Sequence, residues 1–434
     1  MKKKAGAGFG VSPIRAIFAG AAPRRASADD MPTIRITGIG AIADTGVVNV
    51  TPMTLVVGRQ SSGKSTFMKV LCMCQWVEKK LTAGDPDFLY SITHYGRFIK
   101  ELKSFFRLDD SFFSDRSSIE YDGVAVGIKY GGGRNVRIER RPGAARHNAK
   151  LCFIPSERNV ATVMPNFDRV YRSQHLDVIF NYFLEYQEAR THYRRGVPLA
   201  MPFDGDVSYY YDEASDDDRV VVGRAGGELR ASYASSGLQS AIPLTVLVDY
   251  ASRLVGRQPA KSVSDISSLV KELMLAENRG GGERSSIAKA FADAYTYRSV
   301  KFYIEEPELN LFPASQYDMV RFIVGSIART AGTDGAGGPS GAVMTTHSPY
   351  VLTSLNHLMR ASVAKAAGHA VDVPALPVGS FSAYRITEEG TFEDIVDHGL
   401  HFIKGDYLDS ISDFLQDADA KLDDMIYGGA GFPE

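Results

Sequence analysis

The sequence predicts an α/β fold, because strand-like and helix-like stretches alternate around a glycine loop with the residues of a phosphate site. Apolar strand-like runs lie at 33–37, 47–50, 53–57, 301–305 and 342–346. The glycine loop, Gly58 to Ser65, directly follows the third run, and the next segment, Thr66 to Lys80, is apolar on most sides. A helix of that kind is normally buried against a sheet. Strand, glycine loop and buried helix in this order are what a nucleotide-binding fold requires.

The glycine loop is the first candidate site. It consists of Gly58, Arg59, Gln60, Ser61, Ser62, Gly63, Lys64 and Ser65, and Thr66 is placed to cap or pack the helix. The two glycines let the backbone curl, so that consecutive N–H groups point at phosphate oxygens. We expect Lys64 to reach the β- and γ-phosphates and the Ser65 hydroxyl to bind Mg²⁺. The alternative, a glycine-rich turn that only opens a helix, is disfavoured by the loop's position between an apolar strand and a buried helix.

A pair of carboxylates, Glu305 and Glu306, ends the strand at 301–305. Ligands bind at the C-terminal ends of the strands in open α/β sheets. We expect Glu305 to hold Mg²⁺, directly or through water, and Glu306 to polarise the attacking water as general base. Taken alone, Glu-Glu-Pro could be a solvated turn; after a phosphate loop the catalytic interpretation is favoured.

The next strand, 342–346, leads into Thr-Thr-His-Ser-Pro, which contains His347. A histidine at that position can hydrogen-bond the γ-phosphate or the attacking water. A lone histidine is more often a structural residue, but its place after the Glu-Glu strand favours a catalytic switch.

A fourth element, Ala234 to Gln239, precedes the apolar helical run Ile242 to Leu254. A Ser-Ser-Gly turn that opens a helix points hydroxyl and N–H groups one way. Ser235, Ser236 and Gly237 are therefore candidates for a second phosphate contact, although by themselves they could be a simple helix cap.

In this order, the four elements resemble the ATP-binding-cassette (ABC) class of ATPase heads. Within it they look most like the OLD/RecF-like group, often labelled AAA-type ATP-binding proteins, of phage defence and DNA repair. The matching segments are Gly58 to Ser65, Ala234 to Gln239, Ile304 to Glu308 and Thr346 to Pro349, together with Phe153 to Arg158. The resemblance covers about residues 31–400.

The resemblance implies an ABC-type ATPase head with a mixed or parallel sheet core, an inserted β/α lid region and a helical subdomain. It implies ATP and Mg²⁺ as ligands and a head-to-tail homodimer or higher homo-oligomer. Each ATP would lie between the phosphate loop of one protomer and the Ser235–Gly237 signature of the other. Such sharing fits the physics, because many donors are needed to neutralise the γ-phosphate.

Three features depart from the group's pattern. The segment after the glutamates reads Leu311-Phe312-Pro313, where a histidine often precedes the proline. No glutamine lever can be placed between the phosphate loop and the signature. Glu305 stands where many relatives have aspartate.

Composition sets further limits. The charge of −2 conceals a basic N-terminus: residues 1–28 hold six basic and no acidic side chains, and the rest carries 43 basic and 51 acidic residues. The part of the chain after residue 28 has a net charge of −8, which disfavours general binding of polyanions. Any contact with DNA must therefore be confined to a local basic patch. No apolar run is long enough to span a bilayer. Cys72, Cys74 and Cys152 give no disulfide framework and indicate core packing in a reducing cytoplasm.

The expected organisation has five parts. Residues 1–30 read as a disordered basic extension, with a transit peptide or an upstream start codon as alternatives. The ATPase core lobe is expected at 31–84 and 301–400. An inserted lid or interaction region is expected at 85–230, with an acidic loop at 212–218. The signature helix and helical subdomain are expected at 231–300, and an acidic helix and tail at 401–434.

Several functions compete. The first is a regulatory or scaffold ATPase that controls a partner effector, expected to be a nuclease, in antiphage defence; the acidic residues after 380 lack the Asp-x-Asp setting of a metal nuclease. The alternative is a RecF-like ATPase that clamps DNA in repair, since the helical part is too short for the arms of SMC proteins. A transporter subunit is disfavoured by the interruption at 85–230. A dynamin-like GTPase is disfavoured because no guanine-reading motif is found.

Overall fold

The computed structural model describes most of the chain. The described residues are 31–82, 86–133, 135–141, 148–164, 167, 171, 176–223, 227–257, 296–331, 339–376, 379–400 and 402–405. The predicted N-terminal extension at 1–30, residues 258–295 of the predicted helical subdomain and residues 406–434 of the predicted acidic helix and tail lie outside these residues.

The centre of the fold is a six-stranded sheet in the order β16-β15-β4-β14-β13-β8. Its strands are β4 (Met53–Val57), β8 (Ala149–Ile154), β13 (Ser299–Glu305), β14 (Gly341–Thr346), β15 (Phe381–Ile386) and β16 (Phe392–Asp394). All neighbours are parallel except β16, which is antiparallel to β15. Every residue of β4 and β14 is buried, as expected for strands covered on both faces. The predicted α/β class is confirmed.

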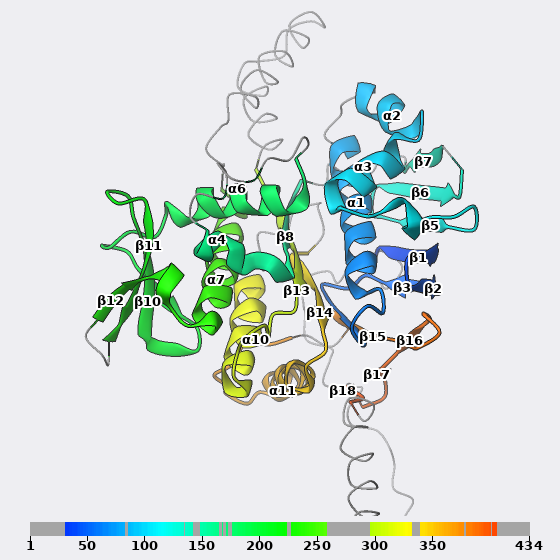
Figure 1. The fold of residues 1–434 in the computed structure, drawn as a ribbon. Coiled ribbons are helices and arrows are strands. Elements are labelled where there is room, and N and C mark those ends of the chain that lie inside the picture. Colours follow the sequence, from blue (N-terminus) through cyan, green and yellow to red (C-terminus); the bar gives the residue numbers. More distant parts are fainter. Residues whose placement is uncertain are drawn as a thin grey trace, which may run out of the picture.

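A second, antiparallel sheet lies beside the first (Figure 1). It runs β2-β1-β5-β6-β7, and β3 also pairs with β1. The strands are β1 (Thr33–Ile39), β2 (Ile42–Asp44), β3 (Val48–Asn49), β5 (Ser118–Asp122), β6 (Val126–Gly131) and β7 (Val136–Arg140). Helix α1 (Lys64–Thr82) contacts strands of both sheets, which explains why 13 of its 19 residues are buried. Helices α2 (Pro86–Thr93) and α3 (Arg97–Phe106) pack near its far end.

Helices cover the other face of the parallel sheet. They are α7 (Ser236–Leu254), α10 (Pro313–Ala328) and α11 (Pro349–Ala366) (Figure 1). Residues 240–252 of α7 are all buried, because α6 (Val178–Arg190), the short α4 (Val160–Val163) and a third sheet cover its remaining sides. That third sheet is β12-β11-β10-β9. Its strands are β9 (Leu199–Met201), β10 (Asp204–Asp212), β11 (Asp217–Val222) and β12 (Gly227–Arg230). Two short strands, β17 (Val396–Asp397) and β18 (Phe402–Ile403), pair near the end of the described chain.

Two sequence expectations need correction. Residues 85–230 were expected to form one insertion, but β5 pairs with β1 and β8 pairs with β13, so residues up to 154 complete the two sheets to which β1 and β13 belong. The acidic stretch 212–218, expected as a loop, belongs largely to β10 and β11 and the tight turn between them. Sheet order depends on contacts between distant segments, which local sequence patterns do not contain.

Within the described ranges, no helix combines the length and apolar character that a membrane crossing requires.

Candidate active site

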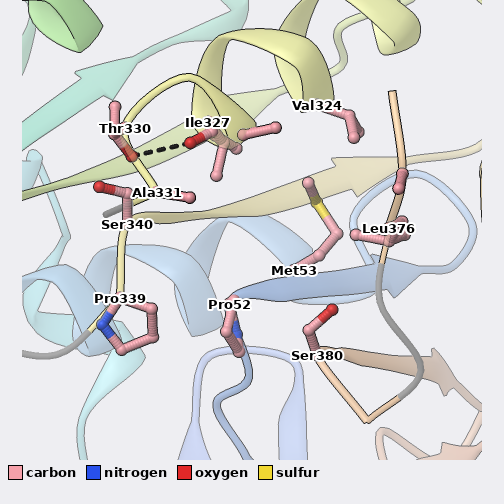
Figure 2. Close-up of a pocket in the computed structure, with 12 residues that line it drawn as sticks. Pro52, Met53, Val324, Ile327, Thr330, Ala331, Pro339, Ser340, Leu376 and Ser380 are labelled. Atoms are coloured by element: carbon pink, nitrogen blue, oxygen red, sulfur yellow. Dashed lines mark hydrogen bonds between the residues drawn. The ribbon is translucent and has the colours of Figure 1, made fainter. Parts of the chain in front are cut away.

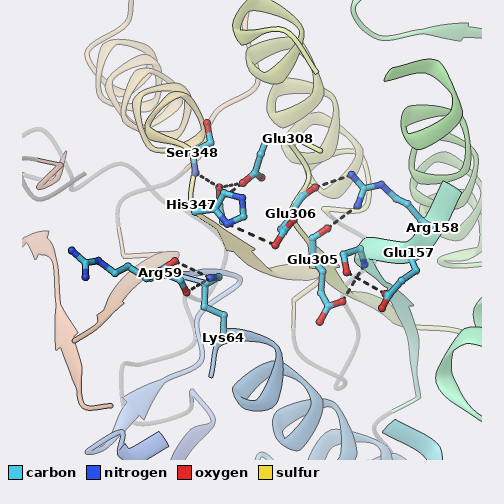
Figure 3. Close-up of polar contacts among 12 residues, drawn as sticks. Arg59, Lys64, Glu157, Arg158, Glu305, Glu306, Glu308, His347 and Ser348 are labelled. Atoms are coloured by element: carbon cyan, nitrogen blue, oxygen red, sulfur yellow. Dashed lines mark hydrogen bonds and ion pairs between the residues drawn. The ribbon is translucent and has the colours of Figure 1, made fainter. Parts of the chain in front are cut away.

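The candidate site lies where several parallel strands end side by side. The register aligns Val57 of β4 with Thr346 of β14, and Thr345 of β14 with Glu305 of β13. The phosphate loop, Glu305–Glu306 and His347 follow these strand ends directly. Parallel pairing therefore brings Lys64, Glu305, Glu306 and His347 to one edge of the sheet (Figure 3).

The phosphate loop requires glycine at two positions. Gly63 has a φ of +104°, and a Cβ there would lie 2.8 Å from Cγ1 of Ile42. A Cβ at Gly58 would lie 2.7 Å from the hydroxyl of Ser62. A side chain at either residue would push the loop apart, so the glycines permit the tight curl on which a phosphate cradle depends.

Lys64 is folded back onto its own loop. Its Nζ donates hydrogen bonds to the carbonyl oxygens of Gly58 and Arg59, both at 2.7 Å, and the residue is 6% exposed. Burial lowers the pKa of Lys64, and the carboxylates of Glu306, Glu308 and Glu305 act in the opposite direction. The ammonium is thus held close to three acidic side chains by bonds that a phosphate oxygen could replace.

Glu305 is 4% exposed, and only one of its two carboxylate oxygens has a hydrogen-bond partner among the described residues. One carboxylate oxygen accepts the N–H of Ser156 at 3.1 Å, while Oε1 has no hydrogen-bond partner among the described residues. Burial raises the pKa of Glu305, and the Lys69 charge and the Ser65 hydroxyl act in the opposite direction. Mg²⁺ is commonly bound by one or two carboxylates together with substrate phosphates. Glu305 and Ser65 fit such an ion, with the unpartnered oxygen as a ligand.

Glu306 and His347 face each other. Oε1 of Glu306 lies 3.7 Å from Nδ1 of His347, with side chains 26% and 40% exposed, so both are open to water. Glu306 has a φ of +46°, which is uncommon for a residue other than glycine. Its N–H donates to the carbonyl of Thr345 at 2.9 Å. Such a backbone conformation persists only where the surroundings hold it.

Glu308 belongs to this site but was not among the residues predicted to act in it. It is 7% exposed, and its Oε1 accepts the hydroxyl of Thr346 at 2.6 Å and the N–H of His347 at 3.1 Å. It thereby fixes the end of β14 and the direction from which His347 projects. The signal for it was the third glutamate of Glu-Glu-Pro-Glu, two residues beyond the proposed base.

Arg158 was also missed, although its segment was noted for the family resemblance. It lies in the 3₁₀ turn η3 (Ser156–Asn159) after β8 and is fully buried. Its guanidinium donates to the carbonyl oxygens of Glu305 at 2.8 Å and Glu306 at 2.7 Å (Figure 3). Sequence alone could not reveal this, because arginine is normally a surface residue.

The predicted signature lies at the start of α7. Ser235 is its N-cap, and its hydroxyl accepts the N–H of Leu238 at 3.4 Å. Gly237 lies against the backbone of Asn310, whose carbonyl oxygen would be 2.8 Å from a Cβ at that position. Among the described residues no hydrogen bond joins Ser235, Ser236 or Gly237 to the phosphate loop. Within the described ranges, these two predicted halves are therefore not hydrogen-bonded to one another.

The remaining loop residues are less constrained. Arg59 forms an ion pair of 2.6 Å with Glu388, but the side chains are 83% and 71% exposed, so water and salt screen the attraction. Gln60 and Ser61 are exposed. Thr66, in the first turn of α1, is buried, with an exposure of 6%. The hydroxyl of Ser62 is buried without a partner among the described residues. With one oxygen each of Glu305 and Glu308, this hydroxyl is the third buried polar group of the site without a partner among the described residues.

A separate cavity of about 220 Å³ lies at the opposite edge of the parallel sheet (Figure 2). It adjoins the first residue of β4, Met53, and Ser340 just before β14, together with apolar side chains such as Val324 and Leu376. The catalytic candidates lie at the other ends of the same strands. The cavity is therefore not the proposed nucleotide site.

The comparisons with known proteins are remote. No family model matches the chain, and no curated protein matches it. The chain is similar to the SMC head bound to the C-winged-helix domain of ScpA, with a TM-score of 0.36 and 9% identity over 84% of this chain and 96% of that one. For the SMC head domain from Thermotoga maritima the TM-score is 0.34 and the identity 8%, over 84% and 98% of the two chains. For an ATP-binding cassette of an ABC transporter in its ADP conformation, the corresponding values are 0.29, 8%, 84% and 90%. At such low similarity, the chemistry of the site must be inferred from its own residues.

Proposed function

We propose that the protein is a Mg²⁺-dependent ATPase of the ABC class. One observation carries the proposal: a lysine, two glutamates and a histidine from three adjacent strand ends converge beside a glycine loop. The residues are Lys64, Glu305, Glu306 and His347 (Figure 3). The unpartnered oxygen of Glu305 supports a cation as part of the same site.

Each side chain has a distinct role in this proposal. The bound Mg²⁺ would neutralise charge on the phosphates and orient them. Lys64 would exchange its two bonds to neutral loop carbonyls for bonds to phosphate oxygens, in which the acceptor is charged as well as the donor. The N–H groups of the curled loop and the N-terminus of α1 would hold the remaining phosphate charge.

Glu306 would accept a proton from the attacking water. Its carboxylate is partly exposed and lies next to the imidazole of His347. The two side chains could therefore share one water molecule between them, with His347 orienting it or contacting the γ-phosphate. The fixed backbone of Glu306 would aim the carboxylate before the substrate arrives.

Dimerisation around ATP is the next part of the proposal. It is supported by the resemblance of Ala234–Gln239 to the ABC signature and by the lack of a bond between this turn and the phosphate loop in the described chain. Ser235 and Gly237 of a second copy would complete the γ-phosphate contacts that one chain leaves open.

The last part of the proposal concerns the biological process that ATP hydrolysis drives. We infer that the ATPase cycle regulates a partner effector, expected to be a nuclease of an antiphage system, and this rests on the family resemblance alone. Reconstitution with the product of a neighbouring gene would test it: ATP-dependent control of that partner supports the role. Nuclease activity from this chain alone would contradict it.

The ATPase itself is tested with two variants and two matched controls. Lys64→Ala is expected to abolish binding of a fluorescent ATP analogue. Glu306→Gln is expected to retain ATP but to lower kcat by on the order of 100-fold or more, as for loss of a general base. The controls Lys129→Ala and Glu120→Gln alter exposed residues of β6 and β5 and are expected to match the wild type. Normal hydrolysis by Glu306→Gln would show that the base is a different residue.

A further inference from the structure

Arg158 is the largest fully buried side chain of the described chain, and its exposure is 0%. Its guanidinium donates to main-chain carbonyls of two distant elements. Toward the catalytic edge it bonds the carbonyls of Glu305, at 2.8 Å, and Glu306, at 2.7 Å. Toward the signature helix its Nε bonds the carbonyl of Ser240, at 3.0 Å, in the second turn of α7. A longer bond of 3.4 Å reaches Pro155.

This arrangement needs an arginine. A buried cation is costly unless its donors are satisfied, and burial lowers the pKa of Arg158 while Tyr182, Glu308, Glu306 and Glu305 act in the opposite direction. The planar guanidinium has five N–H donors in fixed directions, which lets one side chain bond carbonyls on two sides at once. Lysine carries the charge but lacks this fork.

On the catalytic side, the bond to Glu306 holds a strained residue. The N–H of Glu306 donates to the carbonyl of Thr345, and its carbonyl accepts both from Arg158, at 2.7 Å, and from the N–H of Leu309, at 3.0 Å. Its left-handed conformation, with φ of +46°, has no glycine to favour it. Without the bond from Arg158, the carbonyl would be held only by the N–H of Leu309 in its own turn. The peptide would then be tied to no other element through this carbonyl, so that it can relax and move the carboxylate away from His347.

On the helix side, the same short segment holds the start of α7. Pro243 inside α7 has no N–H, which leaves the carbonyl of Gln239 without its helical donor. That carbonyl instead accepts the hydroxyl of Thr162, at 2.9 Å. The side chains of Arg158 and Thr162 thus donate hydrogen bonds to the carbonyls of two consecutive residues of α7, Ser240 and Gln239. These two residues directly follow the Ser235–Gly237 turn and Leu238. Of these two side chains, Arg158 also donates to the catalytic strand, whereas the hydroxyl of Thr162 donates to Gln239 and, within its own turn, to Asn159. The side chain of Ser240 itself accepts from Asn310, in the loop that follows this strand, at 2.9 Å.

We propose that Arg158 is a positioning residue that couples the signature helix to the catalytic glutamate. It holds the backbone of Glu306 in its left-handed conformation and links that backbone to α7, so that movement of the signature turn reaches the Glu306 carboxylate. The proposal rests on the proposed ATPase function, and it assigns no direct contact between Arg158 and the nucleotide.

The test compares Arg158→Lys with Thr162→Val in the full chain. Arg158→Lys keeps a positive charge but loses the fork, whereas Thr162→Val removes a bond to α7 and leaves Glu306 untouched. We expect Arg158→Lys to bind a fluorescent ATP analogue within about threefold of wild type and to leave KM unchanged. We expect its kcat to fall on the order of 100-fold, the scale of a misplaced catalytic group. Thr162→Val should keep kcat within about threefold of the wild type.

Tyr182→Phe is the second variant if Arg158→Lys does not fold. It removes the hydroxyl that donates to the carbonyl of Arg158 at 2.7 Å, so it loosens the residue without removing it. We expect kcat to fall several-fold with KM unchanged and the fold retained, although the thermal midpoint should decrease somewhat because a buried hydrogen bond is lost. If Arg158→Lys or Tyr182→Phe retains the wild-type kcat, the coupling is wrong although the ATPase stands. A wild-type chain that neither binds nor hydrolyses ATP would overturn the proposed function and the coupling together.

Discussion

Four ionisable side chains are buried together at the carboxyl edge of the parallel sheet: Lys64, Arg158, Glu305 and Glu308. Burial of a charge is tolerated where donors and acceptors surround it. Arg158 meets this condition through main-chain carbonyls and Lys64 through its own loop. The two glutamates each retain one oxygen without a partner among the described residues. The edge therefore has two buried carboxylate oxygens without a donor in the described ranges, and such oxygens suit a Mg²⁺ ion.

Substitution of Glu308 tests how β14 presents His347. In Glu308→Ala two buried donors, the hydroxyl of Thr346 and the N–H of His347, lose their acceptor. We expect a loss of about 1–3 kcal/mol in the free energy of unfolding, the usual cost of unsatisfied buried groups. We also expect a lower kcat, because His347 would no longer be held. Urea unfolding and steady-state kinetics measure the two effects.

Glu308→Gln is the matched control, because its amide oxygen can still accept from Thr346 and His347. It is expected to recover most of both stability and kcat. A normal kcat in Glu308→Ala would mean that His347 does not depend on this carboxylate.

At the scale of elements, the nucleotide core could largely be predicted from the sequence. The phosphate loop and the predicted strands at 301–305 and 342–346 lie where the structure has them, within two residues. Buried parallel strands are continuous apolar runs, and such runs are visible without any knowledge of their partners. Because strand ends of a parallel sheet share one edge, the sequence also predicted which side chains would meet there.

The elements that depend on distant pairing could not be predicted. The core strand β8 was assigned to an insertion, and β15 was not recognised as a strand, because neither segment reveals its neighbour in the sheet. The hydrogen bonds by which Arg158 joins α7 to β13 were missed for the same reason. Its partners, Ser240 and Glu305, are 82 and 147 residues away in the sequence.

Helix α1 is tied to the hairpin β5–β6 by a buried glutamate. Glu78 is 1% exposed and accepts the hydroxyl of Tyr121 at 2.6 Å and the N–H of Ala125 at 2.5 Å. Burial raises the pKa of Glu78, while the bonds from Tyr121, Ala125 and Val126 and the charge of Lys301 act in the opposite direction. The folded chain therefore retains the proton to higher pH than the unfolded chain.

A raised folded-state pKa fixes the sign of a pH effect on this link. The contribution of Glu78 to stability is fully present below its unfolded pKa and is lost as pH rises through the folded pKa. Glu78→Gln cannot titrate, so the stability of wild type minus that of Glu78→Gln should decrease as pH rises above about 4.5. Urea unfolding of both proteins between pH 4 and 8 measures this difference. An increase with pH would show that the bonds outweigh burial and lower the pKa.

At the scale of the whole molecule, the signature turn is flanked by exposed aromatic side chains. Tyr233, two residues before Ser235, is 75% exposed, and Phe312, after the Asn310 backbone that contacts Gly237, is 76% exposed. Exposed aromatic residues are common anchors of protein interfaces. Their position beside Ser235 and Gly237 is where a second copy would bind if ATP is shared between two chains.

The dimer can be tested through these two residues. In the slowly hydrolysing Glu306→Gln background, ATP should convert the monomer into a dimer, measured by light scattering after size exclusion. Adding Tyr233→Ser and Phe312→Ser should weaken this dimer by on the order of 10-fold or more, since interface aromatics typically contribute over 1 kcal/mol each. Binding of ATP by the monomer should not change, because Lys64 and the phosphate loop are untouched.

The control for these substitutions is Tyr95→Asn. Tyr95 is equally exposed, at 75%, but lies between α2 and α3, and asparagine tolerates its φ of +57°. It should leave the ATP-dependent dimer intact. If the serine variants dimerise as well as their parent, the two chains meet through another face. If Tyr95→Asn weakens the dimer instead, that face includes α2 and α3, and the signature turn would not be part of a shared ATP site.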